Sequence, residues 1–206
     1  MGLRPSKKRN GCQVFIAFWL QVPYNRRMSE KLLLVSCCAP CSIGVIKKLK
    51  EEGTDVTVLF YNPNIRPLAE YQRRLAENKK VCAHFKVPFI DLPYDSEIWD
   101  RMTAGLEQEP ERGKRCDVCF LMRLKRAAQF AKANGFTRMS SVLGISRHKD
   151  FDHVCRAGLT AGADVGVPYD TRDWRPYRAE SAALAREFNL YRQNYCGCKP
   201  REPKNG

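Results

Sequence analysis

The chain has 206 residues, of which 44% are hydrophobic and 28% are charged, as is typical of a globular protein. This length suffices for one ordinary domain with its own core, so neither disulfides nor metals are required merely for folding. Lysine and arginine number 36 against 22 acidic residues, and the formal net charge of +14 favours a polyanionic partner such as nucleic acid.

Residues 1–27 form a basic segment with six arginine or lysine residues and no acidic residue. A short apolar stretch follows the first basic residues, as in a signal peptide, but it contains glutamine and no small-residue cleavage site follows it. It is also too short to span a bilayer. We therefore expect 1–27 to be an extension outside the fold, 28–199 to be one domain and 200–206 to be a tail. Translation starts at either Met1 or Met28.

The remaining sequence predicts strands that alternate with helices. The first strand, 31–36, is a short apolar run typical of a buried parallel strand. The other expected elements, in chain order, are a helix from 40 to 53, a strand at 56–61, a helix at 68–85, a strand at 89–92, a short helix at 95–102, a helix at 116–134, a strand at 141–145, a short helix at 152–159, a loop at 162–173 and a helix at 177–188. This alternation predicts a single α/β domain with a mostly parallel, Rossmann-like sheet flanked by helices.

Most of the ten cysteines fall into three short clusters at junctions between predicted elements. The clusters are CCAPC at 37–41, CDVC at 116–119 and CGC at 196–198. Thiolates grouped in this way hold a metal or a cluster, or they exchange electrons. Adjacent and one-apart cysteines are also typical of a reducing cytosol, so we expect a cytoplasmic protein with no membrane-spanning segment.

The first cluster begins directly after the first predicted strand. Open α/β sheets bind ligands at the carboxyl ends of their strands, which places Cys37 and Cys38 at the expected site. The following helix points its amino terminus at the same place, and we expect its partial positive charge to lower the thiol pKa values. Cys41 is either a further ligand or simply part of the first helical turn.

The other two clusters each allow more than one chemistry. Cys116 and Cys119 lie three residues apart, so one helix would direct both sulfurs to the same side, which suits zinc, an iron–sulfur cluster or a dithiol couple. Nearby basic residues offset thiolate charge or contact a phosphate. A disulfide between Cys196 and Cys198 would close a small, strained ring, which favours a transient redox pair, although two thiols also bind metals.

Other candidate residues carry weaker signals. We expect Cys82 and Cys155 to pack in the core and His84 to be structural, whereas His148 and His153 flank the carboxyl end of the fourth strand and are candidates for the site. The loop after the first strand contains neither G-x-x-x-x-G-K-[ST] nor G-x-G-x-x-G, which argues against a nucleotide-using enzyme.

Aromatic and basic residues are interleaved near the last cysteines. Aromatic rings stack on unpaired bases and arginine contacts phosphate, so this region is a candidate RNA-binding surface, the alternative being an ordinary charged surface. The residues are Tyr169, Arg172, Trp174, Arg175, Tyr177, Arg178, Tyr191, Arg192 and Tyr195.

Several motifs occur together in one order along the chain. They are CCAP at 37–40, YNPNI at 61–65 followed by Glu70, Tyr71 and Arg74, RCDVC at 115–119 followed by Arg123 and Leu124, and YRQNYCGC at 191–198. On these motifs the chain resembles the QueH-type epoxyqueuosine reductases over about residues 31–198.

The resemblance implies a [4Fe–4S] enzyme that reduces epoxyqueuosine at the wobble position of tRNA to queuosine, the last step of that modification. Its partners would be tRNA carrying epoxyqueuosine and an unidentified electron donor. The cluster ligands would be Cys37, Cys38, Cys116 and Cys119, and the catalytic redox pair would be Cys196 and Cys198. Some members have an acidic residue where this chain has Cys41, which leaves an additional metal ion near Cys41 open.

Two other hypotheses share the basic charge and the cysteines. One is a non-catalytic zinc-binding RNA module, which has no redox response because zinc has no redox chemistry. The other is a tRNA-thiolating enzyme. Such an enzyme would need ATP, and the absence of a phosphate-binding loop from this sequence argues against it. The reductase also requires a proton donor, for which Asp117, His148 and Tyr195 are the candidates.

Overall fold

The computed structural model describes residues 30–193 and 195–198. The extension expected at 1–27 and the tail expected at 200–206 lie outside these residues. Within the described part, no helix is long and apolar enough to cross a membrane.

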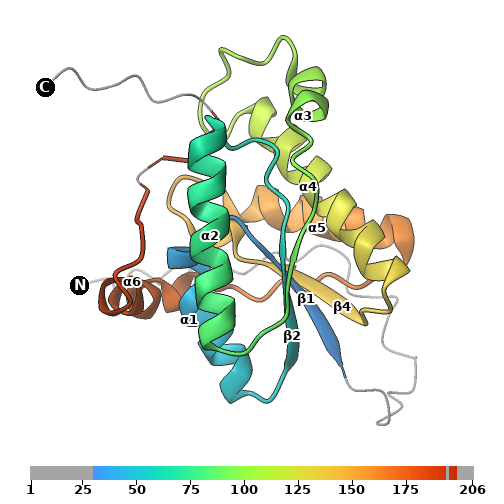
Figure 1. The fold of residues 1–206 in the computed structure, drawn as a ribbon. Helices are drawn as coiled ribbons and strands as arrows, with labels where there is room; N and C mark the ends of the chain where they lie inside the picture. The colour runs from blue at the N-terminus through green and yellow to red at the C-terminus, as the bar shows by residue number, and fades with distance from the viewer. Residues whose placement is uncertain (1–29, 194, 199–206) are drawn as a thin grey trace, which may run out of the picture.

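The centre of the fold is a four-stranded sheet in which all strands are parallel (Figure 1). The strands are β1 (Lys31–Ser36), β2 (Asp55–Phe60), β3 (Phe89–Asp91) and β4 (Arg138–Ser141). They lie in the order β3-β2-β1-β4, and β1 pairs along its whole length with β2, from Lys31 opposite Asp55 to Ser36 opposite Phe60. The most buried strand is therefore flanked on both sides.

Within the described residues, six helices surround this sheet. They are α1 (Ala39–Glu51), α2 (Leu68–His84), α3 (Ser96–Thr103), α4 (Lys114–Ala133), α5 (Phe151–Val165) and α6 (Arg178–Glu187), with single 3-10 turns at Leu143–Ile145 and Arg175–Tyr177.

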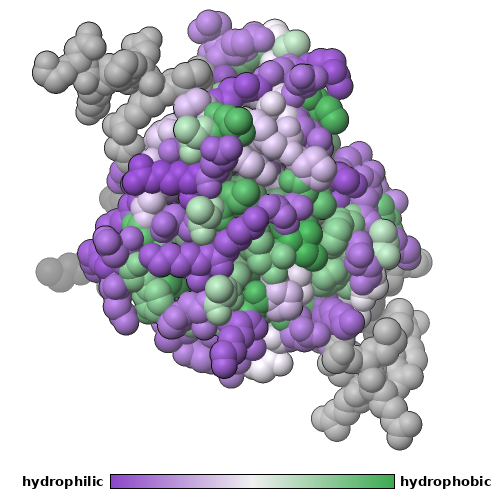
Figure 2. Space-filling model, viewed as in Figure 1, coloured by the Kyte–Doolittle hydropathy of each residue, from purple (hydrophilic) through white to green (hydrophobic). Residues whose placement is uncertain are grey.

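Alternate residues of β1 face two different cores, because successive side chains of a strand point to opposite faces. Leu33 and Val35 pack with residues of α4 and α5, whereas Leu32 and Leu34 pack with residues of α1, α2 and α6. Figure 1 shows α4 and α5 on one side of the strands and α1 and α6 on the other. On the face shown in Figure 2, hydrophilic residues surround a more central hydrophobic area. The predicted α/β fold with a parallel sheet flanked by helices is confirmed.

The helix expected at 152–159 is longer than predicted. It is α5, which runs from Phe151 to Val165 and ends at Gly166 in the left-handed conformation with φ of 73°. Gly158 and Gly162 do not end this helix. A Cβ atom on Gly158 would overlap the Tyr169 ring, and one on Gly162 would overlap the carbonyl oxygen of Val167. These glycines instead allow close approach of the following segment.

The strand expected at 141–145 is also wrong in its bounds. The strand is Arg138–Ser141, and the apolar residues after it form the 3-10 turn Leu143–Ile145. The sequence pattern did not indicate this strand, because the strand contains two buried serines in place of apolar residues. The hydroxyl groups of both serines are hydrogen-bonded. Ser140 Oγ accepts from Trp174 Nε1 at 3.2 Å, and Ser141 Oγ lies 2.8 Å from Tyr169 Oη.

Replacement of Gly158 by Ala tests this close packing. We expect Gly158→Ala to destabilise the fold by about 1–3 kcal/mol through overpacking, which corresponds to about 2–4 °C in Tm for each kcal/mol. Thermal unfolding measures the change. In a Tyr169→Leu background the same substitution should cost less, because the ring that it meets is gone. An equal cost in both backgrounds would contradict the packing described.

Candidate active site

The sheet has a topological switch point between β1 and β4. From β1 the chain proceeds outward through β2 and β3, and it then returns to place β4 on the other side of β1. In open parallel sheets this reversal leaves a crevice at the carboxyl ends of the two strands, where ligands bind. Cys37 and Cys38 follow β1, and the segment that ends in Lys149 follows β4. Both therefore border this crevice.

Cys37 and Cys38 are almost completely buried, with exposed fractions of 4% and 2%. Their sulfurs lie 3.9 Å apart, and the carbonyl oxygen of Cys38 accepts from the backbone amides of Cys41 and Ser42 as α1 begins. The pKa of Cys37 is raised by the Cys38 thiol and by burial. Although the bond from Cys37 lowers the pKa of Cys38, the Cys41 thiol and burial raise it to about 12. The expected lowering by the helix terminus is therefore wrong, because the neighbouring thiols and burial outweigh it.

Two cations lie beside these thiols. Lys149 Nζ donates to Cys37 Sγ at 3.4 Å. Arg123 has no solvent exposure, and it donates to the carbonyl oxygen of Tyr61 at 3.1 Å and to the amide oxygen of Asn62. Both of these acceptors are uncharged, so neither neutralises the Arg123 charge. That charge therefore acts on the nearby thiols. Desolvation lowers the pKa of Lys149, but the nearby Cys37 and Cys196 raise it by a larger amount. The net pKa of Lys149 is therefore above its usual value.

Cys116 and Cys119 lie on α4, and Arg123 follows Cys119 by one helical turn. Cys119 is buried, and desolvation raises its pKa. Cys116 is partly exposed, and its sulfur accepts from the backbone amide of Arg112 at 3.3 Å. The helical spacing that the sequence predicted is confirmed. The same helix thus supplies two thiols and two buried cations, Arg115 and Arg123.

The segment with Cys196 and Cys198 is attached to α2 by one buried arginine. Arg74 bonds to Glu70 Oε1 at 2.6 Å and donates to the carbonyl oxygens of Cys196 at 2.9 Å and Tyr195 at 3.3 Å. Gly197 has φ of 101°, which favours glycine, and a Cβ atom there would lie 3.2 Å from Arg74 Nη2. The backbone conformation therefore favours a glycine between the two cysteines, and a side chain there would also press on the Arg74 guanidinium.

The pKa values of the two cysteines of this segment are shifted in opposite directions. A hydrogen bond from Cys198 lowers the pKa of Cys196 well below its usual value, and the charges of Lys149 and Arg123 lower it further. The bond with Cys196 and burial raise the pKa of Cys198. Both thiols are free. Cys196 is therefore the more acidic thiol of the pair, and Cys198 is the less acidic one.

Two cavities open beside the cysteines. The first has a volume of about 790 Å³ and is lined by Cys41 and His148 among others. The second has a volume of about 550 Å³ and is lined by Trp99, Arg115 and Cys198. The cysteine site is thus bordered on two sides by space that a substrate or partner can enter.

Two polar atoms near the thiols lack partners. Trp99 Nε1 and Arg115 Nε are buried and form no hydrogen bond among the described residues. The Trp99 indole is close enough to Cys119 to lower the pKa of that thiol, although burial raises it overall. Buried donors normally have partners, and a sulfur atom of an iron–sulfur cluster or of its thiolate ligands is a suitable acceptor. These donors, the thiols and the nearby cations together fit an anionic iron–sulfur group.

Across residues 30–193 and 195–198, no three His, Cys, Asp or Glu side chains are grouped as ligands of one metal ion. Each iron of a [4Fe–4S] cluster takes its own cysteine, so the cysteines of such a cluster do not converge on one ion.

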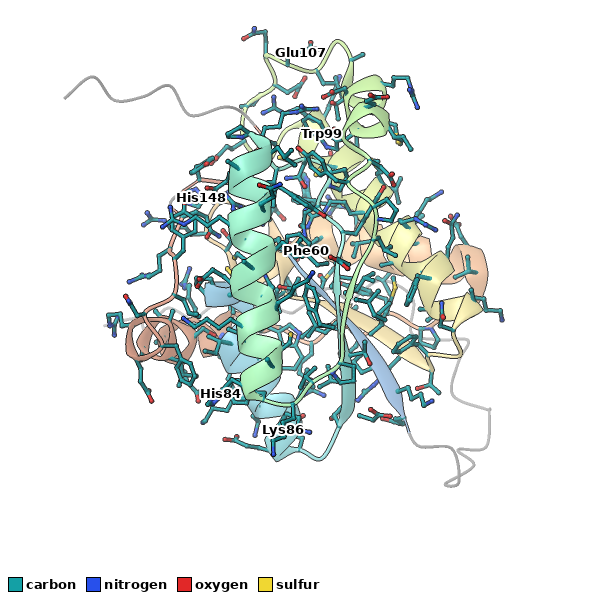
Figure 3. All side chains as sticks on the ribbon, viewed as in Figure 1. Phe60, His84, Lys86, Trp99, Glu107 and His148 are labelled. Atoms are coloured by element: carbon teal, nitrogen blue, oxygen red, sulfur yellow. The ribbon has the colours of Figure 1, made fainter. Side chains whose placement is uncertain are left out.

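The remaining predicted residues divide between core and site. Cys82 and Cys155 are buried, as predicted. His84 packs edge-on against Phe85 and Phe188. Figure 3 shows His84 at the lower end of α2, whereas Trp99 is near the top of the view. Cys41 is partly exposed and lines the first cavity.

The proton-donor candidates lie in different places. His148 lines the first cavity, and its Nδ1 is 3.4 Å from Glu111 Oε2. Asp117 is half-exposed and lies 2.5 Å from His153 Nδ1, so His153 pairs with this carboxylate and not with a thiol. The Tyr195 ring lies under the Arg74 guanidinium, 5.2 Å from ring centroid to Cζ. Among these candidates, His148 borders a cavity beside the cysteines.

Sequence patterns alone missed Lys149 and Trp99 altogether. Lys149 stands in a polar run that is typical of a surface loop, and nothing in that run indicates a thiol partner. Arg123 and Arg74 carried a signal that could have been used. Each is a charged residue at a buried position of an amphipathic helix, which is expected only where a buried partner exists.

Most of the interleaved aromatic and basic residues have structural roles. Trp174 is buried under Arg172, which pairs with Glu52, and Arg175 pairs with Asp173. Tyr169 is partly buried and hydrogen-bonds with Ser141, and Tyr191 donates to Glu70 while Arg73 stacks on its ring. Arg178 and Arg192 instead line the first cavity. The predicted RNA-binding surface is thus reduced to the part at this cavity.

Comparisons with known proteins agree with these motifs. A family model described as "Epoxyqueuosine reductase QueH" matches residues 32–202, a range that includes all three cysteine clusters. A protein of that name from Histophilus somni (strain 129Pt) is 40% identical over 198 residues, which cover 95% of this chain and 80% of that protein. Its counterpart from Acinetobacter baylyi is 42% identical over 182 residues, 87% of this chain and 82% of that protein. The protein of that name from Haemophilus influenzae is 43% identical over 172 residues, which cover 82% of this chain and 70% of that protein.

The opposite acidities of Cys196 and Cys198 predict selective alkylation. In reduced, metal-free protein near neutral pH, iodoacetamide should modify Cys196 before Cys198, because the thiolate is the nucleophile. Cys198 should react only as the pH becomes alkaline. Peptide mass spectrometry at a series of pH values measures both rates. Faster modification of Cys198 at neutral pH would contradict the assignment of the thiolate.

Proposed function

Because the chain belongs to the epoxyqueuosine reductase QueH family, we propose that it reduces epoxyqueuosine at the wobble position of tRNA to queuosine. The observation that carries the proposal is the meeting of all three cysteine clusters beside Lys149 and Arg123 at the switch point of the sheet. The site of action would be the cytoplasm, where tRNA and reduced thiols are found.

The proposed cofactor is a [4Fe–4S] cluster. Its ligands are Cys37, Cys38, Cys116 and Cys119. Burial of Cys37, Cys38 and Cys119, the Arg123 charge and the Trp99 Nε1 donor support this set. When bound, such a cluster supplies single electrons at a potential set by its surroundings.

The residues Cys196 and Cys198 are proposed as the redox pair. Removal of the epoxide oxygen breaks two C–O bonds, forms an alkene and one water, and consumes two electrons and two protons. The pair holds the two electrons and the proton on Cys198, and it releases them when a disulfide forms between the two sulfurs, so the second proton must come from another group. An external electron donor must then reopen that disulfide. Lys149 and Arg123 favour the thiolate state of Cys196 throughout.

The proton that completes the departing water must reach the epoxide oxygen. His148 is proposed for this role because it lines the cavity that Cys41 also lines. An imidazole ring nitrogen that carries a proton can donate it to a nearby oxygen, which suits a general acid. Glu111 lies beside the ring and orients it.

Paired cysteine variants test the function. Cys116→Ala/Cys119→Ala should abolish conversion of epoxyqueuosine tRNA to a nucleoside lighter by one oxygen atom, because two cluster ligands are lost. The matched control is Cys82→Ala/Cys155→Ala, which removes two buried thiols from the core. Nucleoside mass spectrometry after incubation with a chemical reductant measures the conversion. Activity in the first double variant would contradict the ligand set, and an inactive wild-type protein with a full cluster would contradict the reaction.

Removal of the Trp99 N–H tests its contact with the cluster. Trp99→Phe keeps an aromatic ring but deletes the donor, and hydrogen bonds to cluster sulfurs raise the reduction potential. We therefore expect a more negative midpoint potential with the cluster content unchanged. Redox titration followed by visible absorption measures the shift. A potential equal to that of the wild type would show that Trp99 Nε1 does not bond to this group.

A further inference from the structure

The larger cavity lies at the switch point itself. The residues that line it include Cys41, which follows β1, and Arg147 and His148, which follow β4. The start of α6 and the segment before the last cysteine pair complete the wall. The Cys41 thiol interacts with that of Cys38, so the cavity adjoins the buried thiols. A volume of about 790 Å³ is within the range of sites for small organic ligands, which includes nucleosides.

The charge around this cavity is strongly positive. Arg147, Arg178 and Arg192 line it, all three are exposed, and no acidic residue is part of the lining. In the described part of the chain none of these three guanidinium groups forms an ion pair, whereas several other surface arginines pair with carboxylates. The carboxylate of Glu111 lies next to the lining and pairs with His148. Three unpaired arginines around one cavity favour phosphate groups.

Two further groups in the wall lack partners. Ser181 is 2% exposed, and its Oγ forms no hydrogen bond among residues 30–193 and 195–198. Gln193 Oε1 is buried and also has no partner in that part of the chain. An unpaired buried polar atom is costly, and a ligand that supplies a partner relieves that cost. The N–H groups on the edge of a guanine-like base are suitable donors for Gln193 Oε1.

The smaller cavity has a different character. It is lined by Arg66 and Arg115 but also by Asp100 and Glu107, and it reaches Cys198. Mixed charge of this kind favours a polyanion less than three unpaired arginines do. The two cavities therefore differ both in charge and in the cysteine that they expose.

We propose that the larger cavity receives the substrate nucleotide, turned out of the anticodon loop, while Arg147, Arg178 and Arg192 bind the phosphates on either side of it. The base lies beside Cys41, and its edge is read by Gln193 Oε1. Single-stranded loops allow such a base to leave its stack. This assignment rests on the proposed function, since it names where that substrate binds.

Charge-removing variants test the phosphate contacts. The probe is an unmodified anticodon stem–loop RNA with guanosine at the wobble position, added to the cluster-loaded protein. Arg178→Gln/Arg192→Gln should weaken its binding about tenfold for each arginine, and the slope of log affinity against log salt should fall by about 0.7–0.9 per lost contact. Lys132→Gln removes one exposed charge at the far end of α4 and should change affinity little. Equal affinity in the wild type and the double variant would overturn the proposal.

Thiol protection tests which cavity the nucleotide occupies. The same RNA should slow alkylation of Cys41 in the loaded protein and leave alkylation of Cys198 unchanged. Protection of Cys198 without protection of Cys41 would overturn the proposal and place the nucleotide in the smaller cavity. Failure of the proposed function has another signature, which is protection of Cys41 by RNA in a protein that does not convert epoxyqueuosine. Visible absorption of each variant shows that its cluster is intact.

Discussion

The site depends on positive charge placed beside buried thiols. Thiolates in a poorly hydrated position are unfavourable unless cations compensate them. Arg123 meets this need from α4 without any solvent exposure, and Lys149 meets it from the loop after β4. Both act on Cys37 and on Cys196, which are far apart in the sequence. The charges of these two cations therefore act on thiols from all three cysteine clusters.

The parallel sheet explains how these distant segments meet. The reversal of strand order brings the ends of β1 and β4 together, and α4 begins at the same end of the sheet. The last cysteines come from outside this framework, and Arg74 attaches them to α2 through two backbone carbonyl oxygens. One consequence is a site with two openings of different charge. The larger opening is lined by Cys41, and the smaller one is lined by Cys198.

Much of this arrangement was predictable, and the exceptions have physical causes. The bounds of β1 and α2 followed from apolar runs and helical spacing, because local pattern determines these elements. The bounds of α5 did not, since Gly158 and Gly162 serve packing rather than termination. Positions of Cys37 and Cys38 followed from the strand before them. Their raised pKa values did not, because burial and neighbouring thiols act in three dimensions. Lys149 was not predictable, because its partner lies 112 residues away.

The most direct test of the proposed cluster is the iron, zinc and acid-labile sulfide content of protein purified without oxygen. A chain that holds one [4Fe–4S] cluster should contain about four irons and about four sulfides, with a broad visible absorption that bleaches on reduction. Stoichiometric zinc without sulfide, unchanged after attempted cluster reconstitution, would contradict it. In that case the basic, cysteine-rich site would belong to a zinc-binding RNA module with no redox chemistry.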